Sequence, residues 1–390
     1  MSEELEKEVK PYEKNAKKHP DKQLLQIAKS IKEFGWQQPI VVDKEGIIIV
    51  GHGRWFAFEK YGKELKMDEP RVEVADNLTE EQVNAYRLAD NKLNESDWDM
   101  GLAIDELREL SPEMFDLTGF DQDLLIEPDE KDDEIPENPP SVAQLGDVWI
   151  LGNHRVMCGD STKKEDVEKL MDGKKAQFFM ADPPYNVEYT GGSTNKKERV
   201  DSYADKKSEK DYTEWLVLIL QNGFNFTDEK APLHLWFAGS KIKSVVDACY
   251  DNHWFIRNLI VWNKLNAHYG ALGARYKEKK EPMLYCSKEG KSSRWYGKTN
   301  ETTVWDEVQA SKNELHPTMK PVSLYVKSIL NHIQKEDIVY EAFLGSGTTL
   351  IAAEKTGRIC YGMELDPKYV DVIIKRYEDY TDNKAVKEKE

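Results

Sequence analysis

Hydrophobic and polar positions follow two different patterns along the chain, and each predicts its own architecture. In the first third, apolar residues recur at helical spacing from Leu24 to Ile31, and this pattern ends at Gly35. The apolar run over residues 39–50 is interrupted by Lys-Glu-Gly, which predicts two short strands joined by a turn. A glycine-rich turn at residue 51 then leads into a second helix, and residues 79–126 have a mostly helical pattern. These elements predict a small α+β domain.

The second part of the chain alternates short buried strands with helices. Residues 176–181 and 337–343 are apolar runs of strand length, and apolar helical segments lie between and after them. Alternation of this kind predicts a largely parallel sheet with helices on both faces. We therefore expect a larger α/β domain after the α+β domain.

The boundary between the two domains is marked by composition. Residues 128–140 contain four prolines, six acidic residues and almost no apolar side chain. Such a segment cannot build a core, so we interpret it as a linker that does not pack. The predicted organisation is a domain over residues 1–127, a linker over 128–140 and a second domain over 141–390.

Charge is distributed unevenly over these segments. The chain has a net charge of −17, of which residues 1–127 carry −12 and the linker −5. Residues 241–298 hold 12 basic and 5 acidic residues, so one part of the second domain could attract a polyanion although the whole chain repels it. The longest apolar runs are far too short to span a membrane. Four scattered cysteines without a C-x-x-C pair favour a reducing cytoplasm and argue against a disulfide framework or a metal site.

The clearest chemical signal is Asp182-Pro183-Pro184-Tyr185, directly after the predicted strand 176–181. Ligands of open α/β sheets bind at the carboxyl ends of the strands. The two prolines stiffen the turn, and an aspartate, a carbonyl and an aromatic ring together suit an amino group on a planar base. The same tetrad could also be a structural turn with a packed tyrosine.

A second signal is the turn Phe343-Leu-Gly-Ser-Gly-Thr-Thr349, which lies between a predicted strand and a predicted helix. Closely spaced glycines allow the backbone to approach a ligand at the start of a helix. The turn is not a phosphate-binding loop, because the lysine of that motif is absent. Glu364 follows about 20 residues later at the end of another strand, where an acid can accept hydrogen bonds from ribose hydroxyls.

With these motifs, residues 141–378 resemble an amino-group DNA methyltransferase, which uses S-adenosylmethionine to modify adenine N6 or cytosine N4. The catalytic tetrad precedes the cofactor loop, which is the permuted order of the family's β-type members. The resemblance implies a Rossmann-like methyltransferase sheet, with catalysis by the tetrad at residues 182–185. It implies cofactor contacts from Asp160, His316, Thr318, Lys320, Phe343, Gly345, Ser346, Gly347, Thr348, Thr349 and Glu364.

Residues 10–127 resemble the ParB-like domain that precedes such methyltransferases in some proteins. The stretch Gly51-His-Gly-Arg54-Trp-Phe-Ala57 matches the domain's G-x-x-R-x-x-A box, which in relatives touches nucleotide phosphates. Asn-Ala-Lys-Lys at residues 15–18 departs from the usual Asn-Pro-Arg, and the domain is strongly acidic. Two roles stay open for it, a structural or homodimerisation role and nucleotide binding at Gly51, Arg54 and Ala57.

The resemblance implies a site-specific enzyme of the restriction-modification kind that acts on a flipped-out base in double-stranded DNA. Adenine N6 is the expected target, because members with aspartate at the head of the tetrad are usually adenine-directed. Cytosine N4 methylation and a DNA-binding module with a vestigial methylase are the alternatives. Residues 186–212 and 291–315 are the stretches that could read a DNA sequence, and the basic residues expected at the DNA are Lys264, Arg275, Lys277, Lys279 and Lys280.

Overall fold

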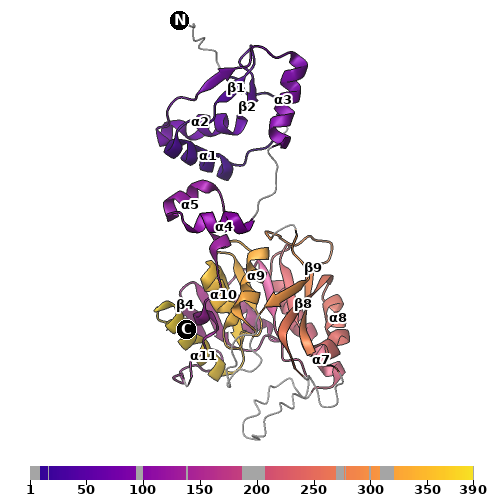
Figure 1. The fold of residues 1–390 in the computed structure, drawn as a ribbon. Helices are drawn as coiled ribbons and strands as arrows, with labels where there is room; N and C mark the ends of the chain where they lie inside the picture. The colour runs from indigo at the N-terminus through magenta and orange to yellow at the C-terminus, as the bar shows by residue number, and fades with distance from the viewer. Residues whose placement is uncertain are drawn as a thin grey trace. The chain divides into compact units, whose positions relative to one another are not determined.

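The computed structural model describes residues 9–389, with the exception of residues 16, 94–99, 138, 187–206, 269–275, 277, 298–299 and 308–319. The chain divides into two compact units, Met1–Leu125 and Ile126–Glu390 (Figure 1). Within the described residues, no helix is both long enough and apolar enough to cross a lipid bilayer.

The first unit has the α+β composition that its sequence pattern predicts. The first helix ends at Gly35 with φ of 73°, and the predicted hairpin forms an antiparallel pair of strands. A third strand, which the sequence pattern did not indicate, pairs in parallel with the first strand of the hairpin. The elements are α1 (Asp21–Phe34), β1 (Ile40–Val42), β2 (Ile48–Val50), α2 (His52–Leu65), β3 (Val72–Val74), α3 (Glu80–Leu93), α4 (Met100–Arg108), α5 (Pro112–Thr118) and the 3₁₀ turn Gln122–Leu125.

The G-x-x-R box of this unit lies at the start of α2. Gly51 caps the helix in the left-handed region with φ of 99°, and a Cβ atom there would meet the Arg54 guanidinium at 3.1 Å. That guanidinium donates to the Gln38 side chain and to the Pro39 carbonyl, both at 2.9 Å, and Ala57 is completely buried. These contacts give each residue of the box a structural role, and nucleotide binding by Arg54 stays a prediction.

The second unit is built on a mixed sheet of ten strands within the described part of the chain. Its central strands, in the order β7-β6-β11-β12-β5, are all parallel, and antiparallel strands flank them on both sides. The strands are β4 (Val148–Leu151), β5 (His154–Cys158), β6 (Phe178–Ala181), β7 (Pro232–Trp236), β8 (Trp254–His268), β9 (Glu278–Lys288), β10 (Val304–Glu307), β11 (Ile338–Glu341), β12 (Ile359–Glu364) and β13 (Val386–Lys387).

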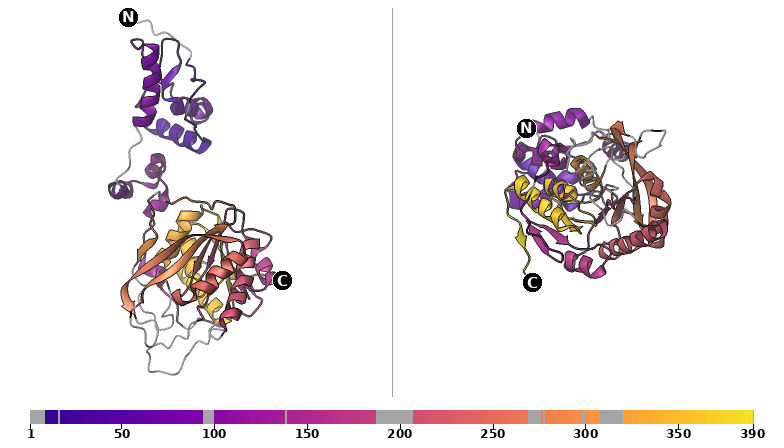
Figure 2. Two further views of the ribbon diagram at one scale, coloured as in Figure 1. Left: turned by 90° about the vertical axis from the view of Figure 1, so that its right-hand side faces the viewer. Right: turned by 90° about the horizontal axis from the view of Figure 1, so that it is seen from below.

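Helices cover both faces of this sheet, which confirms the predicted α/β class (Figure 2). Alternate residues of each strand point to opposite faces, so Phe178 and Met180 join one apolar cluster and Phe179 and Ala181 the other. The first cluster is completed by α9 (Val322–His332), α10 (Thr348–Thr356) and α11 (Pro367–Thr381), and the second by α6 (Lys164–Met171), α7 (Glu209–Phe226) and α8 (Ile242–Asp251).

The segment expected to be an unpacked linker packs, in part, on the second unit. Residues Glu130–Asp133 form a 3₁₀ turn, and the Asp132 side chain is buried, where it accepts hydrogen bonds from Lys355 and Tyr380. Asp133 accepts a hydrogen bond from the Val322 amide at the start of α9. The expectation for these residues was wrong because their carboxylates accept from a backbone amide of α9, an ammonium of α10 and a hydroxyl of α11, partners that composition alone does not reveal.

Replacing Asp132 with alanine should lower the free energy of unfolding of the second unit by about 3 kcal/mol. Removing one partner of a buried ion pair leaves the other charge uncompensated, here the Lys355 ammonium, which is 14% exposed. Thermal and denaturant unfolding of the full chain measures the change. Glu137→Ala, an exposed acid of the same segment, is the control and should shift unfolding by no more than about 0.5 kcal/mol. An equal shift in both variants would contradict the assignment.

Candidate active site

The candidate residues of the site line one edge of the sheet in a spatial order that differs from their order in the chain. Asp182 follows β6, the glycine-rich turn follows β11, Glu364 ends β12, and Asp160 lies just beyond β5. Since β6, β11, β12 and β5 are consecutive parallel neighbours, all four groups lie at the carboxyl edge of the sheet. This edge is where open α/β sheets bind ligands. These four groups together form an elongated site, with Asp182 at one end and Asp160 at the other.

Asp182 is held by three side-chain donors. Its Oδ1 accepts the Tyr185 hydroxyl at 2.9 Å, and its Oδ2 accepts the Lys320 ammonium at 2.5 Å and the Tyr325 hydroxyl at 3.3 Å. The Pro184 carbonyl in the same turn accepts the hydroxyl of Tyr212 from α7. The tetrad is therefore fixed both by its own tyrosine and by two helices.

Lys320 is a buried cation beside the tetrad. Its side chain is 3% exposed and reaches Asp182, Tyr185 and Glu281. The contact with the methionine carboxylate of the cofactor that the resemblance implied for Lys320 stays a prediction. Burial by itself lowers the pKa of Lys320, but the Asp182 and Glu281 carboxylates raise it above its usual value. Lys320 thus stays a cation beside the tetrad, at the Asp182 end of the site.

The glycine-rich turn has the conformation that its sequence predicts. Gly345 and Gly347 have φ of 53° and 88°, and Gly347 caps the start of α10 in the left-handed region. A Cβ atom on Gly345 would meet nothing within 4 Å outside its neighbours, so open space lies beside the turn. Arg376 of α11 donates to the Ser346 carbonyl at 2.9 Å and holds the turn in place. The first amides of α10 add the donors that a helix start leaves unpaired.

Glu364 is placed to receive hydroxyl donors. Its Oε2 accepts the Gly345 amide and its Oε1 the Asp366 amide, both at 2.9 Å. Burial raises the pKa of Glu364 to about 7, against the opposing effect of these two amides. A ligand with hydroxyl groups would stabilise the charged form of this acid. Together with the open space at Gly345, this carboxylate fits the ribose and the methionine part of S-adenosylmethionine.

Glu341 is a buried acid directly before the glycine-rich turn. Its side chain is 1% exposed at the end of β11, and burial raises its pKa to about 8. Oε2 accepts the Thr349 hydroxyl and Oε1 the Phe343 amide. The acid is therefore mostly neutral at pH 7, and its hydrogen bonds to Phe343 and Thr349 hold the two ends of the glycine-rich turn.

The remaining candidates fall into two groups. His316, Thr318, Arg275 and Lys277 lie outside the described residues. So do residues 187–206 of the first stretch expected to read sequence, and residues 298–299 and 308–315 of the second. Asp160 accepts the amide and the hydroxyl of Thr162, and Phe343 packs against Trp215. Thr348 and Thr349 are buried in the first turn of α10.

The basic residues of the 241–298 stretch are divided between opposite edges of the sheet. Lys279 and Lys280 are exposed at the start of β9, on the edge that carries Asp182. Lys264 is 20% exposed, and its ammonium is paired with Glu281 at 2.6 Å. Its charge is thus neutralised inside the site, which leaves little for a phosphate.

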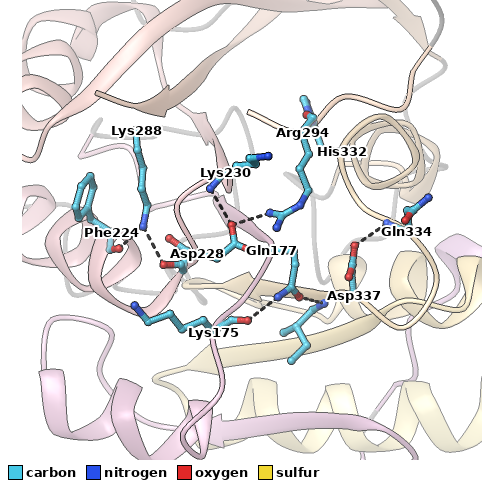
Figure 3. Close-up of polar contacts among 12 residues, drawn as sticks. Lys175, Gln177, Phe224, Asp228, Lys230, Lys288, Arg294, His332, Gln334 and Asp337 are labelled. Carbon is cyan, nitrogen blue, oxygen red and sulfur yellow. Dashed lines mark hydrogen bonds and ion pairs between the residues drawn. The ribbon is translucent and has the colours of Figure 1, made fainter. Parts of the chain in front are cut away.

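Other basic residues of this stretch, among them Lys288 and Arg294 (Figure 3), have structural partners at the amino edge of the sheet. Since β9 runs antiparallel to β7, this is the edge opposite the one that carries Asp182. Lys288 donates to the carbonyls of Phe224 and Thr227 at the end of α7, and Arg294 pairs with Asp228 at 2.6 Å. Lys291 pairs with Glu229. The positive charge counted from the sequence is therefore not one surface.

Three residues of the site were not predicted from the sequence: Glu281, Tyr325 and Arg376. Each reaches the site from a different element, namely β9, α9 and α11. None lies within a motif, and each looks like an ordinary strand or helix residue in the pattern of the chain. Only the pairing of distant segments brings them to the tetrad and the glycine-rich turn.

Known proteins resemble both parts of the chain. A DNA methylase family model, that of the N6 and N4 methyltransferases, matches residues 176–376, which is a little over half of the chain. The type II methyltransferase M.HinfI of Haemophilus influenzae is 29% identical over 248 residues, covering 57% of this chain and 68% of that protein. The ParB-like nuclease domain-containing protein YnaK of Escherichia coli is 44% identical over 88 residues, 21% of this chain and 97% of that protein.

Among solved structures, M1.HpyAVI with bound SAM is 21% identical, with a TM-score of 0.43, over 57% of this chain and 98% of the other. The cytosine-N4-specific PvuII DNA methyltransferase is 15% identical, with a TM-score of 0.46, over 64% and 94%. The family match over residues 176–376 contains the tetrad, the glycine-rich turn and Glu364. The chain therefore belongs to the N6/N4 family of S-adenosylmethionine-dependent DNA amino-methyltransferases and carries a ParB-like domain ahead of its methylase domain.

Proposed function

We propose that this methylase modifies the N6 amino group of adenine in double-stranded DNA, with Asp182 as the residue that receives the amine. The observation that supports the proposal is the Asp182 carboxylate at the carboxyl end of β6, next to the glycine-rich turn that follows β11. A carboxylate is a stronger hydrogen-bond acceptor for an amino group than the serine that heads the tetrad of cytosine-directed members.

Asp182 and Pro183 act on the amine by orienting it. The nitrogen lone pair of an aromatic amine is delocalised into the ring, so the free amine is a weak nucleophile. Hydrogen bonds from its two N–H groups to the Asp182 carboxylate and the Pro183 carbonyl would direct the lone pair out of the ring plane. The negative carboxylate also stabilises the positive charge that develops on nitrogen. Both effects depend on positions that are fixed before the substrate arrives.

The cofactor residues have a binding task. Bound S-adenosylmethionine supplies a methyl group activated by its sulfonium charge. In our proposal Glu364 accepts the ribose hydroxyls, the amides of the glycine-rich turn face the methionine part, and Asp160 receives the adenine amino group. Their order along the sheet edge then directs the methionine end toward Asp182.

Tyr185 is expected to stack on the target base after the base has left the duplex, because N6 cannot be reached inside the base stack. Its hydroxyl is fixed by Asp182 and Glu281, and the Lys320 ammonium lies 5.3 Å from the ring centroid. The same ammonium donates to the Tyr185 hydroxyl at 2.9 Å, so the ring is held at its hydroxyl end. The fixed ring costs little entropy when the base binds.

Nucleoside analysis of DNA methylated by the purified protein tests the proposal. N6-methyladenine is the expected product. N4-methylcytosine would show the other amino-methylation of the family, and DNA without any methylated base, together with normal binding of DNA, would indicate a vestigial methylase. Each of these two results overturns the proposal. Sequencing with detection of modified bases gives the recognition sequence in the same experiment.

Neutralising Lys279 and Lys280 together should weaken DNA binding and reduce its salt dependence. Each phosphate that a lysine no longer neutralises lowers the slope of log K against log salt by about 0.9, so the double glutamine variant should have a slope smaller by about 1.8. Glutamines at Lys230 and Lys291, on the opposite edge, are the matched control and should leave the slope unchanged. Equal slopes for wild type and the Lys279/Lys280 variant would show that DNA is held elsewhere.

A further inference from the structure

Glu281 is a buried acid beside the tetrad that lies in none of the motifs identified in the sequence. It lies on β9 opposite Trp262 of β8, and its side chain is 14% exposed. Its Oε1 accepts the Tyr185 hydroxyl at 2.7 Å and the Lys320 ammonium at 2.8 Å, and its Oε2 accepts the Lys264 ammonium at 2.6 Å. It thus contacts two of the three side chains that donate to Asp182.

The four charged groups of this cluster balance. Asp182 and Glu281 carry two negative charges, and Lys264 and Lys320 carry two positive ones. Burial raises the pKa of Glu281, but the two lysines lower it to about 2, so the acid is ionised at any working pH. Without the Glu281 charge, the cluster would have a net charge of +1 at the point where the amine and the sulfonium also bring positive charge.

Asp182 has few free acceptor positions. A carboxylate accepts about four hydrogen bonds, and Lys320 and Tyr325 take two of them on Asp182. The single Tyr185 hydroxyl proton is shared between Asp182 Oδ1 at 2.9 Å and Glu281 Oε1 at 2.7 Å. The Lys320 ammonium also has Glu281 within reach, and it lies 5.0 Å from the Trp236 ring centroid. Lys320 can therefore keep an anionic partner while Asp182 turns an oxygen toward the substrate.

We propose that Glu281 is a positioning residue for amino-group methylation, one that holds Lys320 and Tyr185 so that Asp182 is free to accept the amine. Glu281 acts through its neighbours and has no contact with the base. It offsets the charge of Lys320, which keeps Asp182 a net acceptor for an amine that becomes positive in the transition state. The inference rests on the proposed role of Asp182.

The Glu281→Gln variant tests this in the full-length protein, because glutamine keeps the shape and removes the charge. We expect kcat to fall about 30-fold at pH 7.5, since charge-assisted hydrogen bonds and one buried charge are removed. The affinity for S-adenosylmethionine should change by no more than about fivefold. Glu278→Gln on the same strand is the matched control, because this acid is exposed and outside the cluster.

Two further readouts separate charge balance from a merely structural role. In Glu281→Gln, Lys320 keeps Asp182 but loses the second carboxylate that raises its pKa. The pKa of Lys320 should therefore fall, and kcat of this variant should rise toward that of wild type as the pH rises from 7 to 9.5. The double variant Glu281→Gln/Lys264→Gln restores neutrality and should have a kcat at least threefold higher than that of Glu281→Gln. Glu281→Asp, which keeps the charge, should retain more activity than Glu281→Gln.

The inference is overturned if kcat of Glu281→Gln stays within twofold of wild type, or if the double variant is slower than the single one. If Glu281→Gln does not fold, Glu281→Asp replaces it, with an expected fall in kcat of about threefold to tenfold and unchanged cofactor affinity; wild-type kcat would then refute the inference. Activity of Asp182→Ala distinguishes the two proposals. An active Asp182→Ala removes the proposed function, whereas an inactive Asp182→Ala with a normal Glu281→Gln removes only the positioning role.

Discussion

Asp182→Ala should reduce the rate of methyl transfer about 10³-fold and leave the binding of S-adenosylmethionine intact. The carboxylate is the proposed acceptor for the amine and the only negative group that faces it directly in our scheme. Removing a single preorganised group that stabilises developing charge costs about 10²- to 10³-fold in other enzymes, and Asp182 also orients the lone pair. Transfer of a labelled methyl group to DNA measures the rate, and a titration with the cofactor measures binding.

The controls for this prediction separate chemistry from folding. Asp182→Asn keeps the size and one acceptor, so it should lose less activity than alanine. Asp251→Ala, an exposed acid at the end of α8, should have wild-type rates. If Asp182→Ala retained more than about one tenth of the wild-type rate, a loss below about 1.4 kcal/mol, the catalytic role of Asp182 would be refuted.

The binding of S-adenosylmethionine should strengthen about tenfold between pH 6 and pH 8 and then level off. Burial raises the pKa of Glu364 to about 7, so the acid is mostly protonated at pH 6 and mostly ionised at pH 8. Hydroxyl donors bind the ionised form better, and binding below pH 7 must first remove its proton. Isothermal titration at constant ionic strength measures this dependence.

Glu364→Gln should weaken cofactor binding about 100-fold at pH 8 and abolish the pH dependence. The loss corresponds to about 2.7 kcal/mol, which is within the range for hydrogen bonds to a charged group. Glu289→Gln is the control, because Glu289 is exposed and pairs with His253 away from the site. A tenfold pH effect that persists in Glu364→Gln would assign the titration to another group and contradict the role of Glu364.

The local elements and the motif positions could be predicted because they depend on neighbouring residues. The helix that ends at Gly35, the hairpin with its Lys-Glu-Gly turn, and the glycine-rich turn at the start of α10 follow from backbone preferences of single residues. The tetrad likewise follows directly from the end of β6. β3 was missed, because Val72-Glu73-Val74 is too short an alternating run to indicate a strand.

Charge and packing were harder to foresee, because a charge count along the chain does not say which residues face one another. Lys264, Lys288 and Arg294 looked like members of one basic surface, yet each is bound to a group that lies far away in sequence or on another element. The acidic segment at residues 129–133 looked incapable of packing, but Lys355, Tyr380 and Arg376 receive it. In both cases the tertiary fold supplies a partner of opposite charge or a hydrogen-bond partner, and that partner determines whether the charged residue is exposed or packed.

The sequence by itself determined the class of the fold, the family and the residues at the ends of β6, β11 and β12, since motifs and periodicity are local properties. Only the tertiary structure decided the order β6-β11-β12-β5, which aligns Asp182 with the cofactor residues along one edge. It also decided that the Lys320 ammonium contacts both the Asp182 and the Glu281 carboxylates. Glu281 on β9 and Lys320 just before α9 reach the tetrad from segments about 100 to 140 residues away in the chain. Hydrogen bonds and buried charges between such distant segments have no signature in the local pattern, and they form only when the sheet brings its strands together.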